Sequence, residues 1–226
     1  MSLRIHLLDA GRVLDPWRMQ IEPLIHDSLA ELSDHFDLSD LDVIVYPSTQ
    51  SIPELGVNGF AESGHLLHLK LDVSNRYFAS QHAQAIPALL AHEVHHCMRD
   101  RTVGYGETLA QALVSEGLAC AFERQVTGRL PAYATALSDT QLDEWLQRAL
   151  PHLHSPSYDH ASWFFGNPRA GIPRHCGYSL GYAQVDSWMK KTGCTAGAAV
   201  DVPATAFWQP GEDGSTPPDT STAHAC

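Results

Sequence analysis

The segment HEVHH places two histidines and a glutamate at a spacing that can build a metal centre. His92 and His96 are four residues apart, so on a helix they project from one face and can share one ion. Glu93 is rotated about 100° from His92, which places its carboxylate beside the ion, where it can accept a proton from a zinc-bound water. His95 is a competing ligand, although we expect it to pack within the helix or to orient a ligand. Because the chain contains 14 histidines, HEVHH needs the support of a second, independent feature.

Glu116 supplies this second feature. Its neighbours at helical spacing are apolar and place it on the face of a helix that should be buried; they are Leu109, Ala112, Leu113, Ala119 and Cys120. A buried carboxylate is costly unless it is paired or bound to a metal, and a zinc ion would provide the compensation. Two helices joined by a short turn pack antiparallel, so Glu116 can approach the histidine pair. The alternative is a buried salt bridge, with Arg99 or Arg124 for example.

Three further residues could assist the chemistry of such a centre. Tyr178 and Tyr182 are four residues apart and share a helix face, and His175 lies just before them. A phenol or an imidazole near the zinc could donate a hydrogen bond to the oxyanion of a tetrahedral intermediate. The alternative for each residue is a place in the core or in the wall of a pocket.

At this point the sequence resembles known metallopeptidases. HEVHH followed 20 residues later by the glutamate of SEGLA resembles the gluzincin pattern, as in thermolysin-like enzymes. HEVHH, LVSEGLA, WFFG and GYSLGY together resemble a bacterial family of predicted zinc-dependent proteases, over about residues 57–208. The resemblance implies a zincin-like fold and one Zn²⁺ ion. It also implies that His92, His96 and Glu116 are the ligands and that Glu93 is the catalytic base.

The resemblance also assigns a role to one strand and leaves one position open. In zincins an edge strand above the active-site helix pairs with an extended substrate, which implies this role for the strand near GHLLHLKLD. Thermolysin-like enzymes carry an aspartate one turn after the glutamate ligand to orient a histidine, whereas this chain has Cys120. Other acceptors for a histidine N–H are then needed, and the candidates are Glu107, Glu123 and Asp100.

Strands are expected first and helices afterwards, which predicts an α+β fold with a small N-terminal sheet, an active-site helix and a mostly helical C-terminal part. The predicted strands are LRIHLLDA, LDVIVYP and GHLLHLKLDV, with a loop over 47–59 and a turn at Asn58-Gly59. The predicted helices cover about 15–36, 86–99, 107–126, 139–150 and 178–191. We expect one domain over 1–208, with a strand-containing part over about 1–77, a helical part over about 78–208, and a disordered tail over 209–226.

Composition excludes several classes of partner. The net charge of −12 and the lack of a basic stripe argue against binding to nucleic acid. No apolar run approaches the roughly 20 residues that a membrane span requires, so we expect no membrane partner. The start of the chain lacks the features of a secretory signal, which favours a cytoplasmic location. The five cysteines include no CxxC pair, so a thiolate zinc site is not indicated. The sequence does not indicate an oligomeric state.

The sequence therefore predicts zinc-dependent hydrolysis of a peptide or protein substrate, with a zinc-bound water activated by Glu93 as the nucleophile. Two alternatives stay open at this stage. The same ligands could serve a zinc hydrolase of a non-peptide amide or ester, because ligands alone do not choose the substrate. A non-catalytic metal-binding module is the other alternative, although a structural site has no need of a base such as Glu93.

Overall fold

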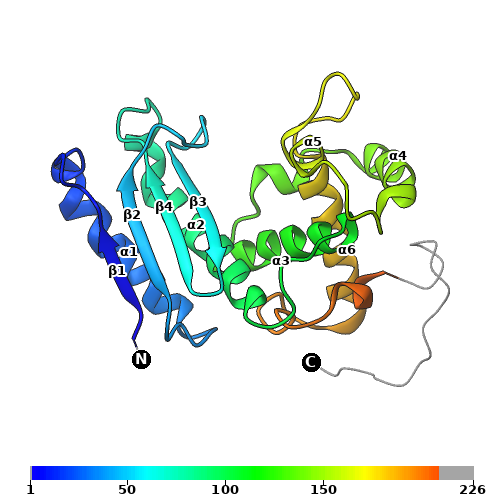
Figure 1. The fold of residues 1–226 in the computed structure, drawn as a ribbon, viewed down its shortest axis with the longest axis horizontal. Helices are drawn as coiled ribbons and strands as arrows, with labels where there is room; N and C mark the ends of the chain where they lie inside the picture. The colour runs from blue at the N-terminus through cyan, green and yellow to red at the C-terminus, as the bar shows by residue number, and fades with distance from the viewer. Residues whose placement is uncertain (1, 209–226) are drawn as a thin grey trace. The chain divides into compact units, whose positions relative to one another are not determined.

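The computed structural model describes residues 2–208. The chain divides into two compact units, Met1–Arg101 and Thr102–Cys226 (Figure 1). The predicted tail over 209–226 lies outside the described residues, and a single domain over 1–208 stays a prediction.

The first unit contains a four-stranded sheet in the order β1-β2-β4-β3. β1 (Arg4–Leu7), β2 (Asp42–Pro47) and β4 (Leu66–Leu71) run parallel, and β3 (Val57–Ser63) pairs antiparallel with β4. Alternate residues of β2 and β4 are buried, as expected for strands that cover a core on one face; they are Val43, Val45, Leu67, Leu69 and Leu71.

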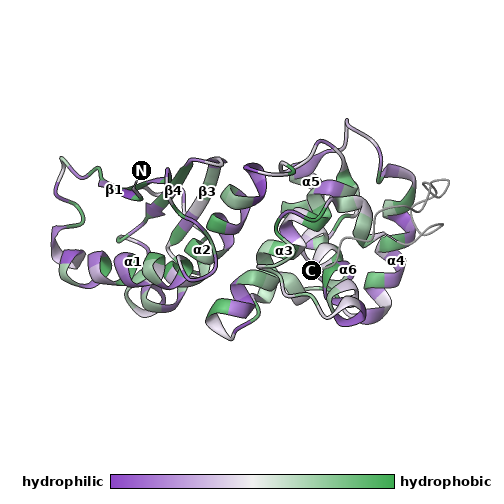
Figure 2. Ribbon diagram, turned by 90° about the horizontal axis from the view of Figure 1, so that it is seen from below, coloured by the Kyte–Doolittle hydropathy of each residue, from purple (hydrophilic) through white to green (hydrophobic). Residues whose placement is uncertain are grey.

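Two helices, α1 (Arg18–Leu32) and α2 (Phe78–Asp100), lie on the same side of this sheet (Figure 2). The predicted start of α2 at residue 86 is wrong, because Pro87 lies inside the helix and not in its first turn. Pro87 cannot donate to the carbonyl of Ala83. Ala83 is exposed, so water can bond to that carbonyl, and the helix continues through the proline.

β3 was not predicted from the sequence, which indicated a loop over 47–59 and a turn at Asn58-Gly59. Asn and Gly are typical turn residues, but here both lie within a strand. Consequently the strand of GHLLHLKLD, β4, is interior, and the prediction that it is an edge strand is wrong. The edge beside α2 is formed by β3, whose register with β4 shifts between Ala61 and Ser63, so that Glu62 is the extra residue of a β-bulge.

The second unit is helical. Its longest helix, α3 (Leu109–Thr127), begins at a capping box formed by Thr108 and Gln111 and ends at Gly128, which adopts a left-handed conformation. The remaining helices are α4 (Asp139–Ala149), α5 (His160–Phe165) and α6 (Cys176–Thr192). The predicted helices over 107–126, 139–150 and 178–191 correspond to α3, α4 and α6, whereas α5 was not predicted.

The predicted fold class is confirmed at the level of an α+β chain with a small four-stranded sheet and a mostly helical remainder. Within residues 2–208, no helix has both the length and the apolar character that crossing a membrane requires.

Candidate metal centre

The two histidines of HEVHH project from one face of α2, as their spacing predicts. Their ring centroids lie 4.9 Å apart, with the ring planes inclined at 74°. His92 is buried. His95 is fully buried, and its ring contacts Phe36 edge-on at a centroid distance of 6.1 Å. His95 therefore packs in the core of the first unit, in agreement with the predicted packing role.

Glu93 is held by the backbone of β3. The N–H of Ala61 donates a hydrogen bond of 2.9 Å to Oε2 of Glu93. A Cβ placed on Gly59 would lie 2.5 Å from Cγ of Glu93 and 2.9 Å from Oε1, so only glycine permits this approach. Neither of these two β3 residues was predicted from the sequence. The signal was present, since a glycine within a strand often marks the close approach of another group, but it was interpreted as a turn.

Glu116 lies on the buried face of α3 with 7% of its surface exposed, as predicted. The hydroxyl of Tyr105 donates a hydrogen bond of 2.8 Å to its Oε1. Arg124, which was considered as an ion-pair partner, instead donates to the hydroxyl of Tyr182 at 2.7 Å. Tyr105 was not predicted from the sequence, because it lies in the irregular segment before α3 and has no periodic pattern to indicate it.

Aromatic side chains surround this carboxylate within the second unit. Burial, and then the charge of Glu116, raises the pKa of Tyr105 well above its usual value. The same two causes raise the pKa of Tyr158. The rings of Tyr105 and His160 lie 6.0 Å apart, and His160 stacks on Phe164 at 4.4 Å. Both phenols therefore remain protonated at neutral pH and can act as hydrogen-bond donors.

Residues of the motifs SEGLA, GYSLGY and WFFG pack closely against one another around the helix that carries Glu116. A Cβ on Gly117 would collide with the carbonyl oxygen of Gly181, and a Cβ on Gly181 would collide with that of Leu113, so α3 and α6 cross with their backbones in contact. A Cβ on Gly177 would lie 2.7 Å from the ring of Phe164. These three glycines let the second unit close tightly about the segment that carries Glu116.

The other predicted site residues occupy two different environments. The ring of Tyr178 contacts Phe164 edge-on at 5.1 Å, and the ring centroid of His175 lies 6.0 Å from that of Tyr178. Phe164 in turn stacks on His160, whose ring centroid lies 6.0 Å from that of Tyr105, the hydrogen-bond donor to Glu116. In contrast, the hydroxyl of Tyr182 accepts from Arg124 and donates to Asp186 at 3.4 Å.

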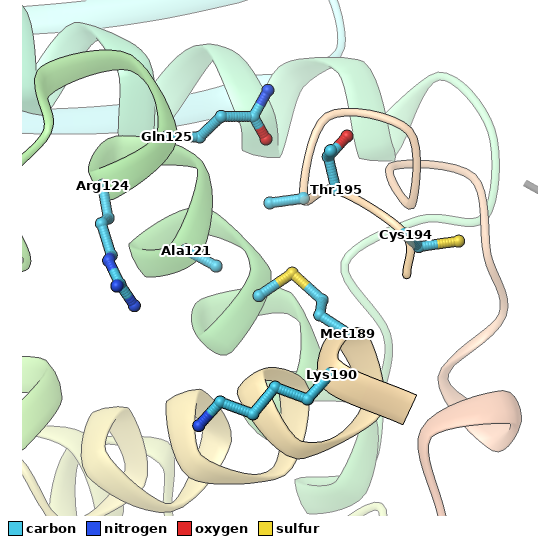
Figure 3. Close-up of a pocket in the computed structure, with 8 residues that line it drawn as sticks. Ala121, Arg124, Gln125, Met189, Lys190, Cys194 and Thr195 are labelled. Carbon is cyan, nitrogen blue, oxygen red and sulfur yellow. The ribbon is translucent and has the colours of Figure 1, made fainter. Parts of the chain in front are cut away.

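Arg124 also lines a hollow of about 330 Å³ in the second unit (Figure 3). Asp186 pairs with Arg124 at 3.8 Å and with Lys190, which also lines the hollow, at 2.6 Å. Tyr182, on α6, therefore belongs to the polar network beside this hollow, and its partner Arg124 lies eight residues after Glu116 on α3.

The three residues considered as acceptors for a histidine N–H have other roles in the structure. Oδ2 of Asp100 accepts from the backbone N–H of Gly64 at 2.7 Å, and Oε2 of Glu123 accepts from the hydroxyl of Tyr133 at 2.7 Å. Glu107 is exposed. Orientation of a ligating histidine by any of them stays a prediction.

His92, His96 and Glu116 form a group of potential metal ligands: each offers one ligand atom, and these atoms lie within 4.8 Å of one another. Two imidazole nitrogens and one carboxylate oxygen are a donor set that suits zinc, and three protein ligands leave a coordination position open. The residues present therefore fit a catalytic zinc ion by donor type, number and proximity.

Comparison with known proteins agrees with this geometry. The family model described as "Predicted Zn-dependent protease (DUF2268)" matches residues 21–209. The chain belongs to this family. It is also 29% identical, over 133 residues, to the uncharacterized protein YjfC of Bacillus subtilis (strain 168). That match covers 53% of this chain and 44% of YjfC, so the similarity spans less than half of the relative's length.

Proposed function

We propose that this protein is a zinc-dependent peptidase in which His92, His96 and Glu116 hold the metal and Glu93 is the general base. The observation that carries the proposal is the proximity of the three ligand atoms, which lie within 4.8 Å of one another. Glu93, next to His92, is not one of them, because its carboxylate accepts a hydrogen bond from the backbone of β3. A structural metal site has no need of a base and usually closes its fourth position with a protein ligand.

Zinc bound by these residues would polarise a substrate carbonyl and lower the pKa of a bound water molecule to about 7. Glu93 would take the proton of the attacking water and later deliver it to the leaving amine. The bond from Ala61 holds Oε2, so Oε1 is the oxygen we assign to proton transfer. Fixing one oxygen keeps the other in a defined position, which general-base catalysis requires.

β3 is the part of the sheet that we propose to bind the substrate. It lies at the end of the sheet, antiparallel to β4, and contacts α2 through Gly59 and Glu93. An extended peptide can pair with such an edge through main-chain hydrogen bonds, a mode of binding that tolerates many sequences. This arrangement, an edge strand beside the helix of HEVHH, is the basis for proposing a zincin-like fold and a peptide substrate.

For stabilisation of the oxyanion we propose Tyr178 and His175, which share the aromatic surroundings of Glu116. Tyr182 is a weaker candidate, because its hydroxyl is already bonded to Arg124 and Asp186.

The test is the substitution Glu93→Gln, which keeps the shape of the side chain and removes its basicity. We expect the zinc content to remain near one ion per chain while hydrolysis of a mixed peptide library disappears. Glu31→Gln is the matched control, since Glu31 is an exposed carboxylate on α1, away from the proposed site, and it should keep wild-type activity. Zinc-loaded wild-type protein that hydrolyses an ester or a non-peptide amide, but no peptide, would refute the peptidase assignment. Equal inertness of wild type and both variants toward all three substrate classes would refute catalysis altogether.

A further inference from the structure

Tyr105 lies in the segment before α3, between two glycines and with its carbonyl bonded to α3. Gly104 and Gly106, on either side, have φ angles of +76° and +102°, which side chains with a Cβ rarely adopt. A Cβ on Gly106 would also collide with the side chain of Gln111. Ser115 donates its hydroxyl to the carbonyl oxygen of Tyr105 at 2.7 Å, so the residue next to Glu116 anchors the backbone of Tyr105.

The hydroxyl of Tyr105 donates to Oε1 of Glu116 at 2.8 Å. Both groups are on the second unit, and Glu116 is buried. A carboxylate can bind a metal ion through one oxygen or through both. If Glu116 bound through both, it would take up the coordination position that a catalytic zinc ion keeps open.

We propose that Tyr105 is a positioning residue for the metal centre: its hydroxyl engages Oε1 of Glu116 and leaves Oε2 as the single ligand atom. The inference rests on the proposed function, because it takes Glu116 to be a ligand. Groups that hydrogen-bond to ligands orient them, and loss of such a group typically weakens metal binding about 10- to 100-fold. Tyr105 would in addition keep the coordination number low.

The experiment compares metal binding by the full chain and by Tyr105→Phe, which removes only the hydroxyl. With Zn²⁺ alone, in competition with a chromophoric chelator, we expect the dissociation constant to rise about 10- to 100-fold. With Co²⁺ in place of zinc, the d–d absorption should weaken, because a second oxygen of Glu116 joins the metal and raises its coordination number. Tyr158→Phe is the matched control: it removes another phenol near Glu116 and should change neither measurement.

A double-mutant cycle with Glu116→Gln separates positioning from a general effect on folding. If Tyr105 acts through Glu116, adding Tyr105→Phe to Glu116→Gln should weaken zinc binding no further. Wild-type zinc affinity and an unchanged Co²⁺ spectrum in Tyr105→Phe, with weakened binding in Glu116→Gln, would overturn the role of Tyr105 alone. Wild-type zinc binding by Glu116→Gln would overturn both this role and the proposed ligand set. The melting temperature of each metal-free variant shows whether it is folded. If Tyr105→Phe does not fold, Ser115→Ala takes its place in the cycle, because it removes the hydrogen bond to the backbone of Tyr105. Ser115→Ala should then weaken zinc binding only when Glu116 is present.

Discussion

Gly59 and Glu93 are in direct contact: a Cβ on Gly59 would lie 2.5 Å from Cγ of Glu93. This distance is far shorter than the about 3.5–4.0 Å that separates two carbon atoms in van der Waals contact. Because Gly59 has no side chain, Glu93 can lie against the backbone of β3, and this contact determines the position of its carboxylate. The adjacent bond from Ala61 then sets how the carboxylate is turned.

Gly59→Ala should therefore impair catalysis much more than metal binding. The new methyl group would push Glu93 away from β3, and misplacement of a catalytic group by about 1 Å can cost about 100-fold in rate. Zinc affinity should stay within a few-fold of the wild-type value, because the three atoms nearest to the new methyl group all belong to Glu93, which is not a proposed ligand. Steady-state kinetics and zinc titration on the same preparations would measure the two effects.

The control for this prediction is Gly11→Ala in the same unit. A Cβ there would meet only Cγ2 of Val13, at an ordinary distance of 3.7 Å, so activity and affinity should both be retained. Parallel losses of rate and of zinc affinity in Gly59→Ala would contradict a specific role in placing Glu93.

Removal of zinc should lower the stability of the protein. A ligand that binds only the folded state contributes about 2.7 kcal/mol when its free concentration is 100 times its dissociation constant. We expect a chelator to lower the melting temperature by several degrees, and Zn²⁺ to restore it. In Glu116→Gln the chelator should have a much smaller effect, whereas Glu144→Gln, an exposed change on α4, should respond like wild type. A melting temperature that does not depend on zinc would argue against a metal centre.

The crossing of α3 and α6 should not tolerate a side chain. Gly181→Ala places a methyl group against the carbonyl oxygen of Leu113, and overpacking of this kind typically costs about 1–3 kcal/mol. Denaturant unfolding would measure the loss. Gly197→Ala, whose Cβ would lie 3.3 Å from the ring of Phe122, should cost much less. Equal stability of the two variants would mean that the helices can separate at the crossing without penalty.

The three candidates for oxyanion stabilisation should differ in their contribution to rate. Tyr178→Phe or His175→Ala should reduce kcat, and loss of one oxyanion donor typically costs about 100- to 1,000-fold. Tyr182→Phe should keep kcat within a few-fold of wild type, because it removes only the bonds to Arg124 and Asp186. A large loss of kcat in Tyr182→Phe, with Tyr178→Phe unaffected, would reverse this assignment.

The helical part of the site could be predicted because a helix has a fixed period. The period of 3.6 residues placed His92 and His96 on one face and Glu116 among apolar neighbours without knowledge of any other element. The same reasoning could not find Ala61, whose bond to Glu93 joins residues 32 apart, or Tyr105, whose bond to Glu116 joins residues 11 apart. Those contacts depend on a strand with weak sequence signals and on a segment shaped by Gly104 and Gly106.

The buried thiols of this protein offer a way to follow each unit separately. Cys97, in the first unit, and Cys176, in the second, are inaccessible to solvent, and burial raises the pKa of each thiol to about 12. Alkylating reagents need an exposed thiolate, so neither cysteine should react until its own unit opens. The rates at which Cys97 and Cys176 become alkylated, with and without zinc, would therefore show whether the two units unfold independently or whether zinc makes their unfolding cooperative.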